Sequence, residues 1–174
     1  MNKFAQIKPL FRYAKVAYYS VVLEGDDKSL YEKFVELHEV ENKEKLYHIQ
    51  KWIQVIGRKY GAQSRLFRNE AKFADTSALP PVGIDRKPHY IDQGKKKNNT
   101  LRLYSFRANE NVVFLFSGAI KTTKKAQDCP NVKSHFLLAN QLTKTIDEAL
   151  RNKIITWIED DTLIHYEEEF KLNY

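Results

Sequence analysis

The stretch LRLYSFRANENVVFLFSGAIK, from Leu101 to Lys121, shows a sharp pattern of secondary structure. Two runs rich in β-branched and aromatic residues, Leu101–Arg107 and Val112–Lys121, flank the polar residues Ala108-Asn109-Glu110-Asn111. This pattern predicts a β-hairpin of two antiparallel strands. With an even number of residues in the turn, Arg107 pairs with Val112, and directly paired side chains lie on the same face of the sheet.

That register gives the hairpin one apolar and one mixed face. The apolar face, which we expect the helices to cover, consists of Leu101, Leu103, Ser105, Val112, Phe114, Phe116, Gly118 and Ile120. The mixed face combines cations with aromatic surface and consists of Arg102, Tyr104, Phe106, Val113, Leu115, Ser117 and Lys121. Because cations hold phosphates and rings stack on bases, the mixed face predicts contact with RNA. A bulge in the turn would exchange the two faces.

The segments before the hairpin predict one strand and two helices. AYYSVVL, from Ala17 to Leu23, is typical of a strand. Ser29 followed by Glu32 forms a capping-box pattern, which indicates a helix running to about His38. Apolar residues at three-and-four spacing predict a longer helix from about residue 42 to 60. Together these two helices form a helical hairpin that can cover one face of a sheet.

The remaining segments complete an α+β domain over residues 17–150. A helix is expected from about residue 131 to 150, after the hairpin. Three prolines interrupt residues 61–99, where we expect at least one further strand. Residues 1–16 are interpreted as an N-terminal extension that can include a short helix, and residues 151–174 as an acidic extension that adds a strand or a helix.

Charge is distributed unevenly along the 174 residues, whose formal net charge is +7. Residues 86–125 contain ten lysines and arginines against Asp92 and Glu110, whereas residues 156–174 have a net charge of −5. A basic field of this kind attracts polyanions, of which nucleic acid is the commonest in a cell. The alternatives are a solvated basic surface without a partner and an acidic tail that folds onto the basic face in place of phosphate.

Several kinds of chemistry find no support in the sequence. The histidines show no metal-ligand spacing, and the single cysteine, Cys129, allows neither an internal disulfide nor a zinc site built on cysteines. There is no phosphate-binding glycine loop and no serine-hydrolase elbow. No apolar run approaches the roughly 18 residues of a membrane span, and no secretory leader is apparent. We therefore expect a cytoplasmic protein that uses cationic chemistry with no metal or other cofactor and no membrane contact.

The order of these elements resembles that of the RelE/ParE superfamily of bacterial toxins, in particular its phage-derived and HigB-like branches. The resemblance lies mainly in Leu101–Leu142, where an arginine-bearing strand is followed by KTTKK, residues 121–125, and a last helix. It implies a RelE-like fold: a small, largely antiparallel sheet with an N-terminal helical hairpin on one face and a helix after the last β-hairpin. It also implies a toxin that cleaves messenger RNA on the ribosome without a metal and is neutralised by a cognate antitoxin protein.

The resemblance further implies roles for individual residues. Arg102 would stabilise the transition state, Lys121 would clamp phosphate or act as a base, and Tyr104 would stack on a base or orient the 2′-hydroxyl. The expected RNA contacts are Arg107, Lys124, Lys125, Lys95, Lys96, Lys97, His89 and Tyr90. Two alternatives remain open: a ParE-like inhibitor of DNA gyrase, and a relative that binds nucleic acid or protein without catalysis.

Overall fold

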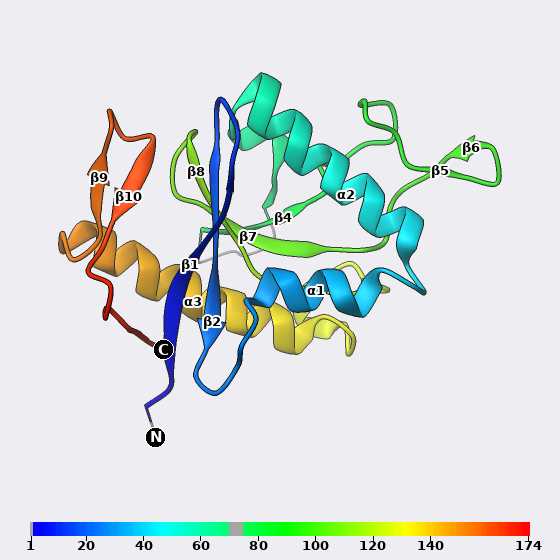
Figure 1. The fold of residues 1–174 in the computed structure, drawn as a ribbon. Helices are drawn as coiled ribbons and strands as arrows, with labels where there is room; N and C mark the ends of the chain where they lie inside the picture. Colours follow the sequence, from blue (N-terminus) through cyan, green and yellow to red (C-terminus); the bar gives the residue numbers. More distant parts are fainter. Residues whose placement is uncertain (1, 70–74) are drawn as a thin grey trace.

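A seven-stranded mixed sheet with helices on both faces forms the centre of the molecule, as seen in a computed structural model of the chain (Figure 1). The structure describes residues 2–69 and 75–174, with only the backbone of Gln127. The strand order is β11-β1-β2-β8-β7-β4-β3, and β2 and β8 are the parallel pair within this otherwise antiparallel sheet. The α+β class is therefore confirmed.

The strands differ widely in length. Those of the main sheet are β1 (Phe4–Arg12), β2 (Ala17–Leu23), β3 (Arg68–Asn69), β4 (Thr76–Leu79), β7 (Leu103–Arg107), β8 (Val112–Leu115) and β11 (Leu172–Asn173). Two small hairpins lie outside it: β5 (Ile91–Asp92) with β6 (Lys95–Lys96), and β9 (Thr156–Ile158) with β10 (Leu163–His165). The further strands expected between residues 61 and 99 are thus present as β3 to β6.

The N-terminal segment is a strand, so the expected short helix within residues 1–16 is wrong. In β1 the side chains of Ala5 and Ile7 are buried and that of Gln6 is exposed, which is the alternation of a half-buried strand. The edge of β1 pairs with β11, where Phe4 lies opposite Asn173. Both predicted extensions therefore contribute strands to the same sheet.

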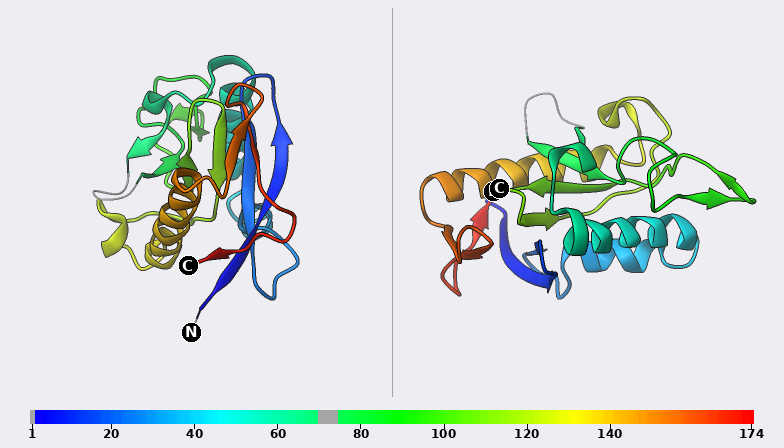
Figure 2. Two further views of the ribbon diagram at one scale, coloured as in Figure 1. Left: turned by 90° about the vertical axis from the view of Figure 1, so that its left-hand side faces the viewer. Right: turned by 90° about the horizontal axis from the view of Figure 1, so that it is seen from above.

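In the part of the chain that the structure describes, α1 (Leu30–His38) and α2 (Lys43–Val55) lie on one face of the sheet and α3 (Lys133–Arg151) on the other (Figure 2). The helices α1 and α2 form the expected helical hairpin, and α2 continues as a π-helical turn, η1 (Ile56–Tyr60). The helix α3 packs on the opposite face. Short 3-10 turns are η2 (Ser64–Leu66) and η3 (Ala126–Asp128). The helical hairpin follows two strands, so the expectation that it is N-terminal is wrong.

The start of α1 confirms the predicted capping box. The hydroxyl of Ser29 accepts a hydrogen bond from the Glu32 amide at 3.2 Å, and the Glu32 carboxylate accepts one from the Ser29 amide at 3.0 Å. These two bonds satisfy backbone donors that the first helical turn leaves unpaired.

Both faces of the β7–β8 hairpin are buried. Leu103, Val113 and Leu115 pack against α1 and α2, and each side chain of this size contributes roughly 1.5–3 kcal/mol on burial. Tyr104 and Phe114 pack against α3 on the other face. The expectation of one open face is therefore wrong, because α3 covers the face that was expected to bind RNA.

The register at the turn also differs from the expectation. Arg107 lies opposite Val113, not Val112, which leaves residues 108–112 in the turn. The Asn109 side chain accepts hydrogen bonds from the amides of Asn111 and Val112 at 2.7 and 2.8 Å and so stabilises this longer turn. As a result, Val113 and Leu115 lie on the face opposite to the predicted one.

A second irregularity follows after Leu115. Ser105 lies opposite Leu115, but Leu101 lies opposite Ile120, so the register shifts by one residue in between, as in a β-bulge. Gly118 is required in this segment, because a Cβ atom there would overlap the carbonyl oxygen of Arg102. We call residues 100–102 and 116–121 the bulged half of the hairpin.

Candidate nucleic-acid interface

Arg102 and Lys121 lie on the same face of the bulged half. The Arg102 amide donates to the Ala119 carbonyl at 3.0 Å, and the Lys121 amide donates to the Thr100 carbonyl at 2.8 Å. Their neighbours Leu101 and Ile120 pack on the α1–α2 side, so both cationic residues belong to the opposite face. Ala119 lies opposite Arg102, and Lys121 is two residues further along the same strand. Diagonal neighbours of this kind on two paired strands have Cα atoms roughly 7–8 Å apart. The two cations to which the resemblance assigned the main roles therefore lie on one face of the bulged half.

The Arg102 side chain is held by backbone oxygens. Its Nη1 donates to the carbonyl oxygens of Asn99 at 2.5 Å and Leu101 at 3.2 Å, and only 9% of the residue is exposed. The Asn99 side chain in turn accepts from the Leu101 amide and donates to the Lys45 carbonyl of α2, both at 2.9 Å. The guanidinium is thus fixed relative to α2, as a positioned charge requires.

A buried histidine anchors the same loop to α2. The two ring nitrogens of His48 lie 3.0 Å from the Pro88 carbonyl oxygen and 3.0 Å from Asn99 Nδ2. Burial lowers the pKa of His48 and so favours the neutral ring, and the Trp52 indole nitrogen donates to its Nε2 at 3.2 Å. Tyr90 is buried with its ring centroid 5.7 Å from that of His48. The predicted RNA contact Tyr90 therefore packs inside the protein.

Most of the other predicted contacts are exposed lysines on two loops. Lys95, Lys96 and Lys97 lie on the β5–β6 hairpin, which projects from the body of the molecule (Figure 1). Acidic neighbours partly neutralise this hairpin, since Lys97 Nζ lies 3.4 Å from an oxygen of Asp92. Lys124 and Lys125 are exposed in the loop that follows the bulged half. His89 is half-buried, and its ring lies 3.1 Å from the Asp85 carbonyl oxygen.

Besides Tyr90, two further predicted site residues lie apart from these exposed lysines. Tyr104 is fully buried beneath α3, with its ring centroid 5.7 Å from that of Phe136, so its ring has no surface on which a base can stack. Arg107 lies at the far end of β7, roughly 16 Å from Arg102 at about 3.3 Å per residue. Its Nε donates to the Ala62 carbonyl.

Cys129 anchors the loop that carries Lys124 and Lys125. Its sulfur accepts from the amide and the hydroxyl of Thr122, each at 3.4 Å. Burial raises the pKa of this thiol, but the hydrogen bonds from Thr122, Asn131 and Val132 outweigh burial and lower the pKa to about 6. A thiolate at this position is a stronger acceptor than a thiol and ties the loop to the start of α3.

A second cationic surface, at the other end of the sheet, was not predicted. We call Tyr13, Arg58, Lys59, Tyr60 and Arg65 the aromatic–basic patch. The Arg58 guanidinium lies 5.3 Å from the centroid of the Tyr13 ring, and the Lys59 ammonium 5.2 Å from that of Tyr60. Cations interleaved with rings suit single-stranded nucleic acid. The sequence showed a basic, aromatic N-terminus and cations off the apolar stripe of residues 42–60, but no pattern joined these segments.

The acidic tail packs beside the 108–112 turn. Glu159 forms an ion pair with Arg12 at 3.2 Å, and the Asp161 carbonyl accepts from the Asn109 side chain at 2.8 Å. The Ile164 amide donates to the Tyr19 hydroxyl at 3.4 Å. These contacts lie at the opposite end of β7 from Arg102.

Comparison with known proteins gave no match to a family model, to a curated protein or to a solved structure. Within residues 2–69 and 75–174, no helix is both long enough and apolar enough to cross a membrane. In the same part of the chain, no three side chains of histidine, cysteine, aspartate or glutamate gather closely enough to hold a metal ion.

Proposed function

We propose that the protein binds RNA at the end of the sheet where β7 begins, and that it cleaves messenger RNA there as the toxin of a toxin–antitoxin pair. The observation that carries the proposal is the placement of Arg102 and Lys121 on one face, next to the loop with Lys124 and Lys125. Clustered cations bind successive phosphates and release counterions. The expected setting is the cytoplasm, with ribosome-bound messenger RNA as substrate and a cognate antitoxin as partner.

The proposed reaction needs no metal. The 2′-hydroxyl oxygen attacks the adjacent phosphorus, the bond from phosphorus to the 5′-oxygen breaks, and the hydroxyl proton leaves while the 5′-oxygen gains one. Arg102 would stabilise the additional negative charge that develops on the phosphate oxygens, because a fixed guanidinium can donate to two of them. Lys121 would hold the same phosphate or accept the proton.

RNA binding without cleavage is the second candidate, and two observations favour it. Arg102 already donates to two carbonyl oxygens, and Tyr104 is buried, so two of the three predicted catalytic side chains are engaged within the fold. The aromatic–basic patch adds a surface that can bind bases without any chemistry.

Induced expression in a bacterial host, with transcript 5′-ends mapped minutes later, tests the proposal. The wild type should arrest growth and produce new ends inside translated codons, whereas Arg102→Ala and Lys121→Ala should produce neither. Lys144→Ala removes an equal charge from an exposed position on α3 and should behave as the wild type. Circular dichroism of each purified variant confirms folding, and the half-buried Lys121 carries the test if Arg102→Ala does not fold.

Salt-dependent binding to single-stranded RNA separates the two candidates. If the protein only binds RNA, wild-type expression yields no new ends. The slope of log affinity against log salt then falls by about 0.7 in Lys121→Ala, because one phosphate contact is lost. Absence of both cleavage and RNA affinity in soluble wild-type protein would contradict both candidates.

A further inference from the structure

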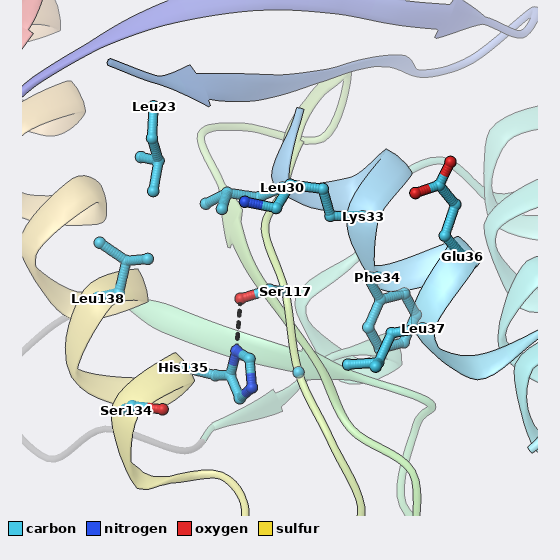
Figure 3. Close-up of a pocket in the computed structure, with 11 residues that line it drawn as sticks. Leu23, Leu30, Lys33, Phe34, Glu36, Leu37, Ser117, Ser134, His135 and Leu138 are labelled. Carbon is cyan, nitrogen blue, oxygen red and sulfur yellow. Dashed lines mark hydrogen bonds between the residues drawn. The ribbon is translucent and has the colours of Figure 1, made fainter. Parts of the chain in front are cut away.

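A cavity of about 590 Å³ opens between α1, the bulged half of the hairpin and the first turns of α3 (Figure 3). Its wall is apolar and is formed by Leu23, Leu30, Phe34, Leu37 and Leu138. The volume lies within the roughly 300–1,000 Å³ of sites that bind small molecules, and such sites are mainly apolar with a few placed polar groups. Leu37 at the rim is 63% exposed, so the cavity leaves apolar surface in contact with solvent.

A hydrogen-bonded polar pair lies inside the cavity, and the side chain of Ser134 also lines it. The Ser117 hydroxyl is 2.9 Å from Nδ1 of His135, and Figure 3 shows both side chains pointing into the space between the leucines. The register shift places Ser117 toward α3, where it meets this ring. Burial and the neighbouring His38 lower the pKa of His135, so the ring is neutral. A neutral imidazole next to a hydroxyl offers hydrogen-bond donors and acceptors but no charge.

The two charged residues at the rim are paired with their own neighbours. Lys33 Nζ lies 2.7 Å from Asp26 Oδ2, and the Glu36 carboxylate forms an ion pair with Lys28. His38 is neutral as well, since burial lowers its pKa, and it donates to the Gly118 carbonyl at 3.1 Å. An ionic ligand would therefore lose hydration without gaining a counter-charge in the cavity.

We propose that this cavity binds an uncharged, largely apolar small molecule whose hydroxyl or carbonyl group hydrogen-bonds to the Ser117–His135 pair. The apolar wall selects the body of the ligand, and the polar pair orients its one polar group. The walls on three sides favour a compact molecule over an extended polypeptide. Arg102, Lys121, Lys124 and Lys125 of the proposed RNA interface do not line this cavity, and the proposal does not rest on that interface.

Fluorescence titration with prodan, an uncharged naphthalene with one ketone group, tests the proposal. We expect saturable one-site binding with a blue-shifted emission. Leu37→Glu should weaken binding at least about tenfold, because it places a charge against the apolar wall. Leu137→Glu is the matched control: Leu137 is 47% exposed and adjacent to Leu138 on α3, but it does not line the cavity. It should leave binding unchanged.

The polar pair is tested with Ser117→Ala and His135→Phe. Each should weaken prodan binding about fivefold, as expected for one lost hydrogen bond, and leave the binding of unsubstituted naphthalene unchanged. Three results would each overturn the proposal. They are prodan binding that does not saturate, an equal loss of prodan affinity in Leu37→Glu and Leu137→Glu, and tighter binding of laurate than of prodan. The last result would indicate an anionic ligand, and the first a surface suited to a partner protein.

Discussion

The regular half of the β7–β8 hairpin, next to the turn, and its bulged half serve different purposes. In the regular half, Ser105, Phe106 and Arg107 lie opposite Leu115, Phe114 and Val113 in an uninterrupted register. Helices cover both faces there, so nearly every side chain is part of the core. In the bulged half the register shifts, and Arg102, Ser117 and Lys121 come to a candidate interface and a cavity. In this sheet, which is buried on both faces, the interrupted register places these polar groups at the end of the hairpin.

The regular half is expected to carry stability. Phe114 is fully buried and stacks on Phe106 at 6.2 Å, so Phe114→Ala should lower the free energy of unfolding by about 4 kcal/mol. Urea denaturation followed by circular dichroism measures this loss. RNA affinity per folded molecule should stay at the wild-type level, and a parallel loss of affinity would contradict the division between the two halves.

The bulged half is expected to be sensitive at Gly118. Gly118→Ala places a Cβ atom against the Arg102 carbonyl, and the required backbone shift should cost about 3 kcal/mol. Because that shift moves Arg102 and Ser117, RNA and prodan binding should also weaken. Ala119→Gly, one position further along, should cost only about 1 kcal/mol and leave both ligands bound. Equal effects of the two substitutions would show that the close approach at Gly118 is unimportant.

The smallest expected effect is a pH dependence that originates in His38 of α1, which contacts the bulged half. His38 donates to the Gly118 carbonyl, and burial lowers its pKa from the ordinary 6.5. The unfolded chain therefore binds a proton at a pH where the folded protein does not, and stability falls as the pH is lowered below 6.5. Thermal unfolding between pH 7 and pH 5 measures the slope. His38→Gln can still donate to the carbonyl and should reduce this slope, and an unchanged slope would contradict the assignment.

Local patterns in the sequence predicted individual elements well. The strand at Ala17–Leu23, the capping box at Ser29 and the long helix after the hairpin are confirmed, because each depends on residues close together in the chain. The strand β1 was missed because a register irregularity between Pro9 and Phe11 interrupts its alternation of buried and exposed side chains. The placement of α3 over the expected RNA-binding face depends on the whole topology, which no local pattern contains.

The sequence predicted that Arg102 and Lys121 lie on the same face of the hairpin, but it did so from a register that is wrong at the turn. The turn contains one residue more than expected, which exchanges the faces of Val113 and Leu115. The shift before Ile120 restores the original alternation, so Lys121 returns to the face of Arg102. Burial of Tyr104 was unpredictable from the hairpin alone, because a ring looks the same in sequence whether a base or a helix covers it.

The parallel pairing of β2 with β8 is expected to slow the folding of this chain. It joins residues 17–19 to residues 112–114, and the pairing of β1 with β11 joins residues 4–5 to residues 172–173. Closing such long loops costs chain entropy before any contact is gained, so proteins rich in distant pairings fold slowly. The β7–β8 hairpin joins neighbouring segments and can form early. The centre of the sheet must then wait for β2 to find β8, and this search is the step expected to limit the folding rate.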